Sequence, residues 1–173
     1  MTPIELNDFC IHLRDRITLK KTSLKIEEGT SSVIMGPTGT GKSVFLKSVA
    51  GILPSTVFRY EGSMKINGID GYIDGKKLDY GQWTQIEQSG LMFVPAETAQ
   101  VMNPALTLDQ NLNLLAPGCR PEIVRRLGEF FTLDFEAFAR LYPDEVSGGE
   151  MQRITLMILL SRPGNLILLD EPT

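Results

Sequence analysis

The sequence predicts an α/β fold built around a phosphate-binding loop, and two observations support this prediction. A short apolar run at 32–35 leads directly into the octet GPTGTGKS at 36–43. A second apolar run at 166–169 ends in the acidic pair Asp170 and Glu171. A glycine-rich turn between a strand and a helix is the setting in which phosphate loops work, and open α/β sheets bind ligands at the carboxyl ends of their strands.

The octet fits the Walker A pattern G-x-x-x-x-G-K-[ST], in which each residue type has its own task. Glycines allow positive φ angles and a close approach of the backbone to a ligand, so that main-chain amides can surround an anion. We expect Lys42 to reach the outer phosphates and Ser43 to place its hydroxyl on Mg²⁺. The nucleotide-binding residues predicted here are Gly36, Pro37, Thr38, Gly39, Thr40, Gly41, Lys42, Ser43 and Val44.

A helix is predicted directly after the octet. Apolar residues recur at helical spacing from Phe45 to Leu53, so one face of this helix should be buried. Gly51 is expected to weaken the helix and Pro54 to end it. The octet therefore has the strand before it and the helix after it that a phosphate loop needs.

Strands are predicted on both sides of the phosphate loop. Runs rich in strand-forming residues occupy 4–13 and 17–26, and further strands are expected at 62–66 and 76–80. Three hairpin-turn pairs between the last two strands predict a small antiparallel β lobe there. The hairpin-turn pairs between the last two strands are Asn67-Gly68, Asp70-Gly71 and Asp74-Gly75.

The sequence becomes helical in character after a short apolar strand at 91–94, which Pro95 ends. Helices are expected near 106–115, from Pro121 onward, and around 135–141. In the helix that Pro121 opens, the residues expected to face inward are Ile123, Val124, Leu127, Phe130 and Phe131. Residues 96–160 therefore form a predicted helical lobe, inserted into a core made of 1–95 and 161–173.

Composition limits the classes of partner. The net charge of −4 argues against a general nucleic-acid surface, which needs a basic face. Neither Cys10 nor Cys119 stands at a metal-ligand spacing, so both are interpreted as reduced thiols of a cytosolic protein. The longest apolar stretch, 154–160, is far shorter than the roughly 20 residues of a membrane span. Any membrane role is therefore expected to be peripheral, through a partner.

A second phosphate-like loop begins a predicted helix at Ser147. Ser147 and Glu150 stand in the S-x-x-E register of a capping box, and a helix start would explain both without any ligand. It does not explain Gly148 and Gly149, because each glycine in a helix costs about 1 kcal/mol relative to alanine. Bare glycines at a helix N-terminus do permit an anion to approach closely, so both interpretations stay open.

The acidic pair also has two interpretations. Asp170 at the end of a buried strand is suited to hold Mg²⁺, and Glu171 to orient and deprotonate an attacking water. An acidic pair after a strand can equally be a solvated turn. The presence of a phosphate loop in the same chain favours the functional interpretation.

Together these segments resemble the ATP-binding-cassette (ABC) ATPases over nearly the whole chain. GPTGTGKS is similar to the Walker A motif of that family, VSGGEMQR at 146–153 to its signature loop, and LILLDEPT at 166–173 to its Walker B motif. The resemblance implies a P-loop NTPase fold with a mixed β core, a small antiparallel β lobe and an inserted helical lobe. Residues 1–173 would form one partial nucleotide-binding domain. Three further segments are most similar to the oligopeptide, dipeptide and nickel importer ATPases, namely Gly51-Ile52-Leu53-Pro54, Met102-Asn103-Pro104 and Tyr142-Pro143-Asp144-Glu145.

The resemblance also implies a mechanism. Two ATPase subunits, identical or related, clamp two ATP molecules, each held by one Walker A motif and covered by the signature loop of the other subunit. By similarity, Lys42 and Ser43 bind phosphate and Mg²⁺, Asp170 supports Mg²⁺, and Glu171 is the catalytic base. ATP hydrolysis would drive a transmembrane permease that imports a peptide, nickel or a similar small solute, from a cytoplasmic position on the inner face of the membrane. The signature-loop residues expected to serve the nucleotide of the partner are Ser147, Gly148, Gly149 and Glu150.

The chain departs from the family pattern at two internal positions. Ala96 stands where the family usually has a glutamine that contacts Mg²⁺ and water, with Glu97 and Gln100 nearby. No aromatic residue occupies the adenine-stacking region, where Leu13 falls nearest, with His12 beside it and Phe9 upstream. We interpret His12, the single histidine of the sequence, as an exposed strand residue. Two alternatives therefore stay open: a non-transport ABC ATPase, or a truncated nucleotide-binding remnant without turnover.

The chain stops at Thr173, before the later strand that the family places between the Walker A and Walker B strands. The predicted sheet is therefore incomplete, and each unpaired backbone group costs about 1–3 kcal/mol if it is buried. Because a whole domain is stable by only about 5–15 kcal/mol, we expect residues 1–173 alone not to fold stably. Thermal melting tests this expectation. A cooperative unfolding transition whose midpoint temperature rises when ATP is added would contradict it.

Overall fold

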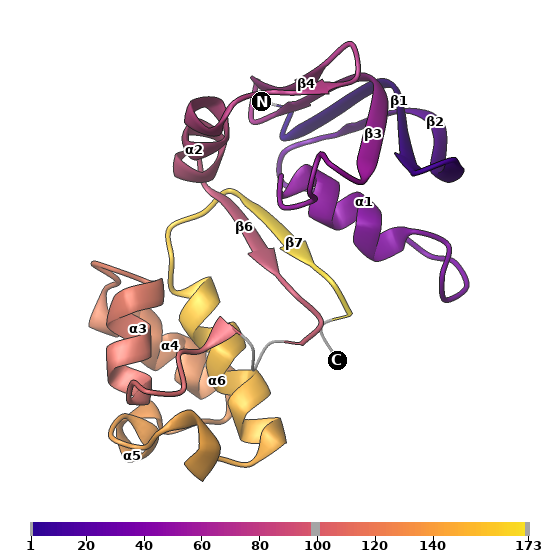
Figure 1. The fold of residues 1–173 in the computed structure, drawn as a ribbon. Helices are drawn as coiled ribbons and strands as arrows, with labels where there is room; N and C mark the ends of the chain where they lie inside the picture. The colour runs from indigo at the N-terminus through magenta and orange to yellow at the C-terminus, as the bar shows by residue number, and fades with distance from the viewer. Residues whose placement is uncertain (1, 98–100, 172–173) are drawn as a thin grey trace. The chain divides into compact units, whose positions relative to one another are not determined.

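The computed structural model describes residues 2–97 and 101–171 and divides the chain into two compact units (Figure 1). The first unit comprises the residues up to Phe93 together with Asn165–Asp170, and the second comprises Val94–Gly164 together with Glu171. Strands and a phosphate loop belong to the first unit, and most of the helices belong to the second. Each unit has its own cluster of buried apolar residues.

A five-stranded antiparallel sheet dominates the first unit, with the strand order β2-β1-β3-β4-β5. Tight turns at Asn67-Gly68 and Asp74-Gly75 have positive φ angles at all four residues, as hairpin turns of this kind require. Asp70-Gly71 is not a turn, contrary to the sequence-based expectation, because Asp70 pairs with Lys65 inside the sheet. The strands are β1 (Ile4–Leu13), β2 (Arg16–Ile26), β3 (Phe58–Ile66), β4 (Ile69–Ile73) and β5 (Lys76–Lys77).

Helix α2 (Tyr80–Gln88) was not expected from the sequence, which predicted a strand over 76–80. The strand β5 ends at Lys77, and Asp79 then starts the helix. Its carboxylate accepts a hydrogen bond from the amide of Gln82 at 3.0 Å, which satisfies one of the free N–H groups of the first turn. Trp83 and Ile86 are the residues that this helix buries.

A β-bulge in β1 decides which side chains face the core. Between Asn7 and Cys10 the strand advances three residues while β3 advances two, and Asp8 adopts a positive φ of 49°. Because one extra residue reverses the alternation of side chains, Leu6 faces the core before the bulge and Phe9 faces it afterwards. Cys10 therefore lies on the opposite face of the sheet.

Helix α1 (Lys42–Val49) ends in a Schellman motif and not at Pro54 as expected. The amide of Gly51 donates to the carbonyl of Ser48 at 3.0 Å, and the amide of Ile52 donates to the carbonyl of Lys47 at 3.1 Å. Gly51 supplies the positive φ of 70° that this motif needs. The sequence suggested that Gly51 would weaken the helix. In the structure, Gly51 forms the C-terminal capping motif of the helix.

The predicted strand at 32–35 is not formed, since residues 31–37 belong to no strand. Val33 and Met35 are 80% and 85% exposed. A strand needs a hydrogen-bonded neighbour, and within residues 2–97 and 101–171 no strand pairs with this segment. The strand β6 (Leu91–Val94), which was predicted, pairs instead with β7 (Leu166–Leu169) in a separate two-stranded sheet.

The second unit is helical, as Figure 1 shows. Val124, Leu127 and Phe131 pack on its core cluster, but Phe130 is 79% exposed and Ile123 is 39% exposed, contrary to the prediction that both face inward. Successive residues of a helix are turned by about 100°, so Phe130 cannot share the face of Phe131. The elements are α3 (Leu108–Leu115), α4 (Pro121–Phe131), α5 (Phe135–Phe138), the 3₁₀ turn η2 (Pro143–Glu145) and α6 (Gly148–Leu160).

We predict that Gly51→Ala destabilises the protein much more than Gly29→Ala. Both glycines have positive φ angles, 70° and 73°, which cost alanine about 1–2 kcal/mol. A Cβ on Gly51 would also lie 2.2 Å from the buried ring of Trp83, whereas a Cβ on Gly29 would meet nothing within 4 Å. Urea unfolding should show a loss of about 3 kcal/mol or more for Gly51→Ala. Equal losses for the two variants would contradict the packing argument.

Candidate nucleotide-binding site

The phosphate loop at 36–41 has the backbone conformation that its glycines permit. Gly39 and Gly41 have φ angles of 80° and 93°, which are rare for residues with a side chain. A Cβ on Gly41 would lie 2.8 Å from the carbonyl oxygen of Thr18, so only glycine fits there. The Thr40 hydroxyl donates to the Pro37 carbonyl at 2.7 Å and closes the turn.

The N-terminus of α1 carries no side-chain cap among the described residues. Its N-cap position is Gly41, and no acidic residue lies in the first turn. By contrast, α2 and α3 are capped by the side chains of Asp79 and Thr107. Uncapped amides at a helix N-terminus, together with the helix dipole, form a site for an anion.

Lys42 lies over the loop that precedes it. Its amine donates to the carbonyl oxygens of Gly36 and Pro37, at 2.9 and 3.0 Å. These are exposed hydrogen bonds between a cation and neutral carbonyls, and a phosphate oxygen is a stronger, charge-assisted acceptor. The amine is thus placed beside the loop, where a phosphate can replace the carbonyls as its acceptor.

Ser43 and Asp170 meet although 127 positions separate them in the sequence. The Ser43 hydroxyl donates to Asp170 Oδ1 at 2.8 Å, and Asp170 is only 4% exposed. A hydroxyl oxygen and a carboxylate oxygen are the hard ligands that Mg²⁺ prefers in sites with phosphate. The donor set therefore fits Mg²⁺. Val44, by contrast, packs its side chain against the core, so it has only its backbone amide to offer a phosphate.

Glu171 follows Asp170 in an unusual backbone conformation. It is exposed, and its φ angle is 47°. A positive φ in a residue other than glycine is uncommon, and it turns the chain immediately after the buried carboxylate of Asp170. Pro172 and Thr173, the last residues of the Walker B segment, lie outside the described residues.

The predicted signature loop caps its own helix. Ser147 is the N-cap of α6, and its amide donates to Glu150 Oε2 at 3.3 Å; the Ser147 hydroxyl also donates to this carboxylate. The capping box expected from the sequence is therefore formed. A Cβ on Gly148 or on Gly149 would meet nothing within 4 Å, and neither glycine has a positive φ. Packing within the described chain thus does not require glycine at either position.

The positions that depart from the family pattern differ in exposure. Ala96 is exposed after β6, while Gln100 lies outside the described residues. Phe9 is fully buried between Tyr60 and Tyr72, which removes it as an adenine-stacking residue. Leu13 is 38% exposed.

His12 is not the exposed strand residue that the sequence suggested. Its side chain is 20% exposed, and Nε2 lies 3.3 Å from Cys10 Sγ and 3.1 Å from Glu61 Oε1. The Cys10-x-His12 spacing was the only signal in the sequence, because Glu61 is brought to the pair by the register of β1 with β3.

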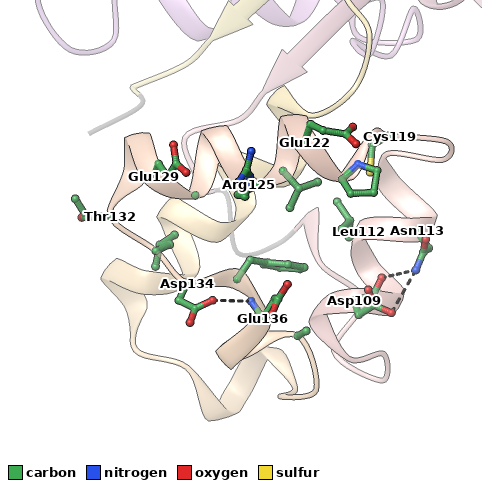
Figure 2. A pocket seen from close by; sticks show the side chains of 16 residues that line it. Asp109, Leu112, Asn113, Cys119, Glu122, Arg125, Glu129, Thr132, Asp134 and Glu136 are labelled. Carbon is green, nitrogen blue, oxygen red and sulfur yellow. Dashed lines mark hydrogen bonds between the residues drawn. The ribbon is translucent and has the colours of Figure 1, made fainter.

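A large hollow lies in the helical unit, and no residue of the phosphate loop lines it. Its volume is about 1000 Å³. Figure 2 shows its lining residues, which come from α3, α4 and α5 and the segments beside them. Acidic side chains predominate over the single cation Arg125. Such an acidic lining does not suit a nucleoside triphosphate, which is itself negatively charged. The candidate nucleotide site is therefore the phosphate loop and not this hollow. The acidic residues are Asp109, Glu122, Glu129, Asp134 and Glu136.

Within the described residues, no helix has the length and apolar character needed to cross a membrane.

Sequence comparison places the chain among proteins of one family. The family described as "ABC transporter" matches residues 19–173. The chain is 32% identical over 159 residues to the Fe(3+) ions import ATP-binding protein FbpC of Serratia marcescens, a match that covers 89% of this chain and 42% of that protein. The chain spans less than half the length of this and other such relatives.

Solved structures agree with the sequence match. The dimeric structure of MJ0796, a bacterial ABC transporter cassette, superposes with a TM-score of 0.76 at 28% identity, covering 98% of this chain and 74% of that chain. A second dimeric structure of MJ0796, in a post-hydrolysis state bound to ADP and Pi, superposes with a TM-score of 0.74 at 27% identity, covering the same 98% and 74%. The predicted P-loop NTPase fold is thereby confirmed. The phosphate loop, the Ser43–Asp170 pair and these matches together show that the chain belongs to the ABC transporter family of ATP-binding domains.

Proposed function

We propose that this chain is part of the ATP-binding subunit of an ABC importer and that it binds and hydrolyses ATP with Mg²⁺. The observation that carries the proposal is the 2.8 Å hydrogen bond between Ser43 and Asp170. It unites the end of the phosphate loop with the end of β7, so that two hard oxygen ligands adjoin the uncapped N-terminus of α1. In this proposal residues 1–173 form one partial nucleotide-binding domain. Its core comprises 1–95 and 161–173, and its helical lobe comprises 96–160.

Phosphate binding uses the backbone of 36–44 and the amine of Lys42. The first-turn amides of α1 bind phosphate oxygens, and Lys42 exchanges its loop carbonyls for the outer phosphates. Ser43 and Asp170 hold Mg²⁺. When bound, the ion supplies positive charge that offsets the charge of the phosphates during transfer. Glu171 accepts a proton from the attacking water.

The signature loop acts in a second subunit, which is identical or related to this one. The MJ0796 structures are dimers, which supports an assembly of two cassettes. In that assembly Ser147, Gly148, Gly149 and Glu150 cover the nucleotide held by the phosphate loop of the partner subunit. The open space around Gly148 and Gly149 supports this role, because a ligand can approach their backbone closely.

The ATPase pair drives transmembrane permease subunits from the cytoplasmic side of the membrane. Several relatives are named as Fe(3+) import ATP-binding proteins, which supports an importer. The solute is a small one: the segments at 51–54, 102–104 and 142–145 favour a peptide, nickel or a similar solute, and those relatives favour ferric iron. Co-purification with a permease distinguishes this importer from an ABC ATPase of a non-transport machine.

One observation favours a second candidate, a nucleotide-binding domain without turnover. Ala96 is exposed after β6, where a methyl side chain can neither bind Mg²⁺ nor orient water. A binding-only domain would retain ATP affinity but release no phosphate. Measurement of both quantities on one preparation decides between the two candidates.

We predict that Lys42→Ala weakens ATP binding by roughly 10–100-fold, because a hydrogen bond to a charged group contributes about 1.5–3 kcal/mol. Lys76→Ala, which removes an exposed lysine of β5, is the matched control and should leave the affinity unchanged. A titration with a fluorescent ATP analogue measures both variants. Equal affinities would remove Lys42 from the site.

Glu171→Gln should leave ATP affinity nearly unchanged and lower turnover by about 10²–10⁴-fold, the usual contribution of a general base. Phosphate release under saturating ATP measures the effect. An unchanged rate of turnover in this variant would exclude Glu171 as the base. Absence of turnover in the unsubstituted protein would support the binding-only candidate.

Ser43→Ala and Asp170→Asn should each abolish the gain in ATP affinity that Mg²⁺ provides over EDTA. The reason is that Ser43→Ala removes a hydroxyl ligand of the proposed ion site, and Asp170→Asn removes the carboxylate charge that binds the cation. The double variant should be little worse than either single variant, since the two groups act as one unit. Asp144→Asn, at an exposed aspartate of η2, serves as the control. Additive losses would contradict a shared ion.

A further inference from the structure

Three metal-ligating side chains converge on the face of the sheet that is turned away from its core. Cys10 and His12 stand two residues apart on β1, and Glu61 stands opposite Cys10 on β3. The bulge between Asn7 and Cys10 places them there, because it brings the flanking Phe9 and Ile11 into the core. Bulges are frequent where a strand must re-aim side chains for function.

Two of the three separations between the ligand atoms are close to those that a tetrahedral ion imposes. His12 Nε2 is 3.3 Å from Cys10 Sγ and 3.1 Å from Glu61 Oε1, and all three atoms lie within 4.8 Å of one another. Bonds of about 2.3 Å to sulfur and about 2.0–2.2 Å to nitrogen and oxygen, at tetrahedral angles, place such ligand atoms roughly 3.3–3.6 Å apart. The cluster therefore needs only small side-chain adjustments to coordinate one ion.

The same geometry argues against a nucleophilic Cys-His-Glu triad. A triad uses both ring nitrogens, one toward the nucleophile and the other toward the carboxylate. Here Cys10 and Glu61 both approach Nε2 of His12, and one ring proton cannot serve both partners well. In addition, burial and the nearby charge of Glu61 raise the pKa of the Cys10 thiol, whereas a nucleophilic cysteine needs a lowered pKa. Three potential ligand atoms gathered within 4.8 Å of one another suit a shared cation better than a triad.

We propose that Cys10, His12 and Glu61 form a binding site for a divalent transition ion of the zinc class. Thiolate, imidazole and carboxylate are the ligands that Zn²⁺ accepts in a tetrahedral site, and three protein ligands leave a fourth position for water. Binding breaks the Sγ–H bond of Cys10, forms an Sγ–metal bond, and releases the proton to solvent. The hydrogen bond that the thiol donates to the Leu19 carbonyl at 3.0 Å is lost in the exchange.

The site is closed on the sulfur side and open on the carboxylate side. Cys10 is 5% exposed, whereas the side chain of Glu61 is 63% exposed. An ion can therefore enter past Glu61 without opening the sheet. No residue of the phosphate loop at 36–43 takes part, so the site is separate from the proposed Mg²⁺ site at Ser43 and Asp170.

Cobalt substitution tests the proposal on the purified full chain. Co²⁺ bound by a thiolate gives a sulfur-to-metal charge-transfer band together with d–d bands of tetrahedral intensity. We expect one Co²⁺ per chain with both signals, which Zn²⁺ displaces, and loss of the charge-transfer band in Cys10→Ser. Cys119→Ser is the matched control and should leave the spectrum unchanged, because Cys119 belongs to the helical unit.

Glu61→Gln keeps the test decisive if Cys10→Ser fails to fold, since Glu61 lies on the surface. Loss of a direct ligand should weaken Zn²⁺ binding by more than the roughly 10–100-fold caused by loss of an outer-shell partner. Competition with a chromophoric chelator measures this affinity. The proposal is overturned if Co²⁺ binds without the charge-transfer band, or if Cys119→Ser and not Cys10→Ser abolishes the band. It is also overturned if Glu61→Gln leaves the Zn²⁺ affinity unchanged.

Discussion

The hydrogen bond between Ser43 and Asp170 is the constraint on which the proposed nucleotide site depends. It connects the first turn of α1 to the end of β7 across 127 positions of sequence. A carboxylate as buried as that of Asp170, at 4% exposure, is costly unless a partner satisfies it. The Ser43 hydroxyl provides that partner, and the pair lies beside the uncapped amides of α1, where the proposed Mg²⁺ ion would bind. The same contact thus serves the stability of the site and its proposed chemistry.

Features with local determinants could be predicted from the sequence. The capping box of α6 follows from Ser147 and Glu150, the start of α4 from Pro121, and the two hairpin turns from their Asn-Gly and Asp-Gly pairs. The prediction of a strand at 32–35 was wrong, because an apolar segment does not form a strand without a neighbouring strand to complete its hydrogen bonds. For α2 the local signal existed, since Asp79 is an ordinary N-cap, but the apolar spacing after it is weak.

Within the sites, the sequence indicated candidate residues but not the contacts between them. Walker A spacing identified Lys42 and Ser43, yet only the structure shows that the Lys42 amine rests on the carbonyls of its own loop. The cluster around His12 was missed for a related reason. Strict alternation along β1 would place Leu6 and Cys10 on one face, and a single extra residue separates them. Register is a property of two paired strands. The sequence of β1 or of β3 alone therefore cannot predict that Glu61 lies opposite Cys10.

The two helix N-termini proposed to meet phosphate differ in a way that bears on the order of events. At α1 the first-turn amides have no side-chain cap in the described chain, so an anion meets no competitor. At α6 the carboxylate of Glu150 already accepts hydrogen bonds from the amide and the hydroxyl of Ser147. A phosphate that takes over these two Ser147 donors must displace a group of its own charge, at the cost of a capping interaction of about 1 kcal/mol. In the proposed assembly, ATP therefore binds first at the phosphate loop, and the signature loop of the partner subunit engages second, once the two subunits have closed.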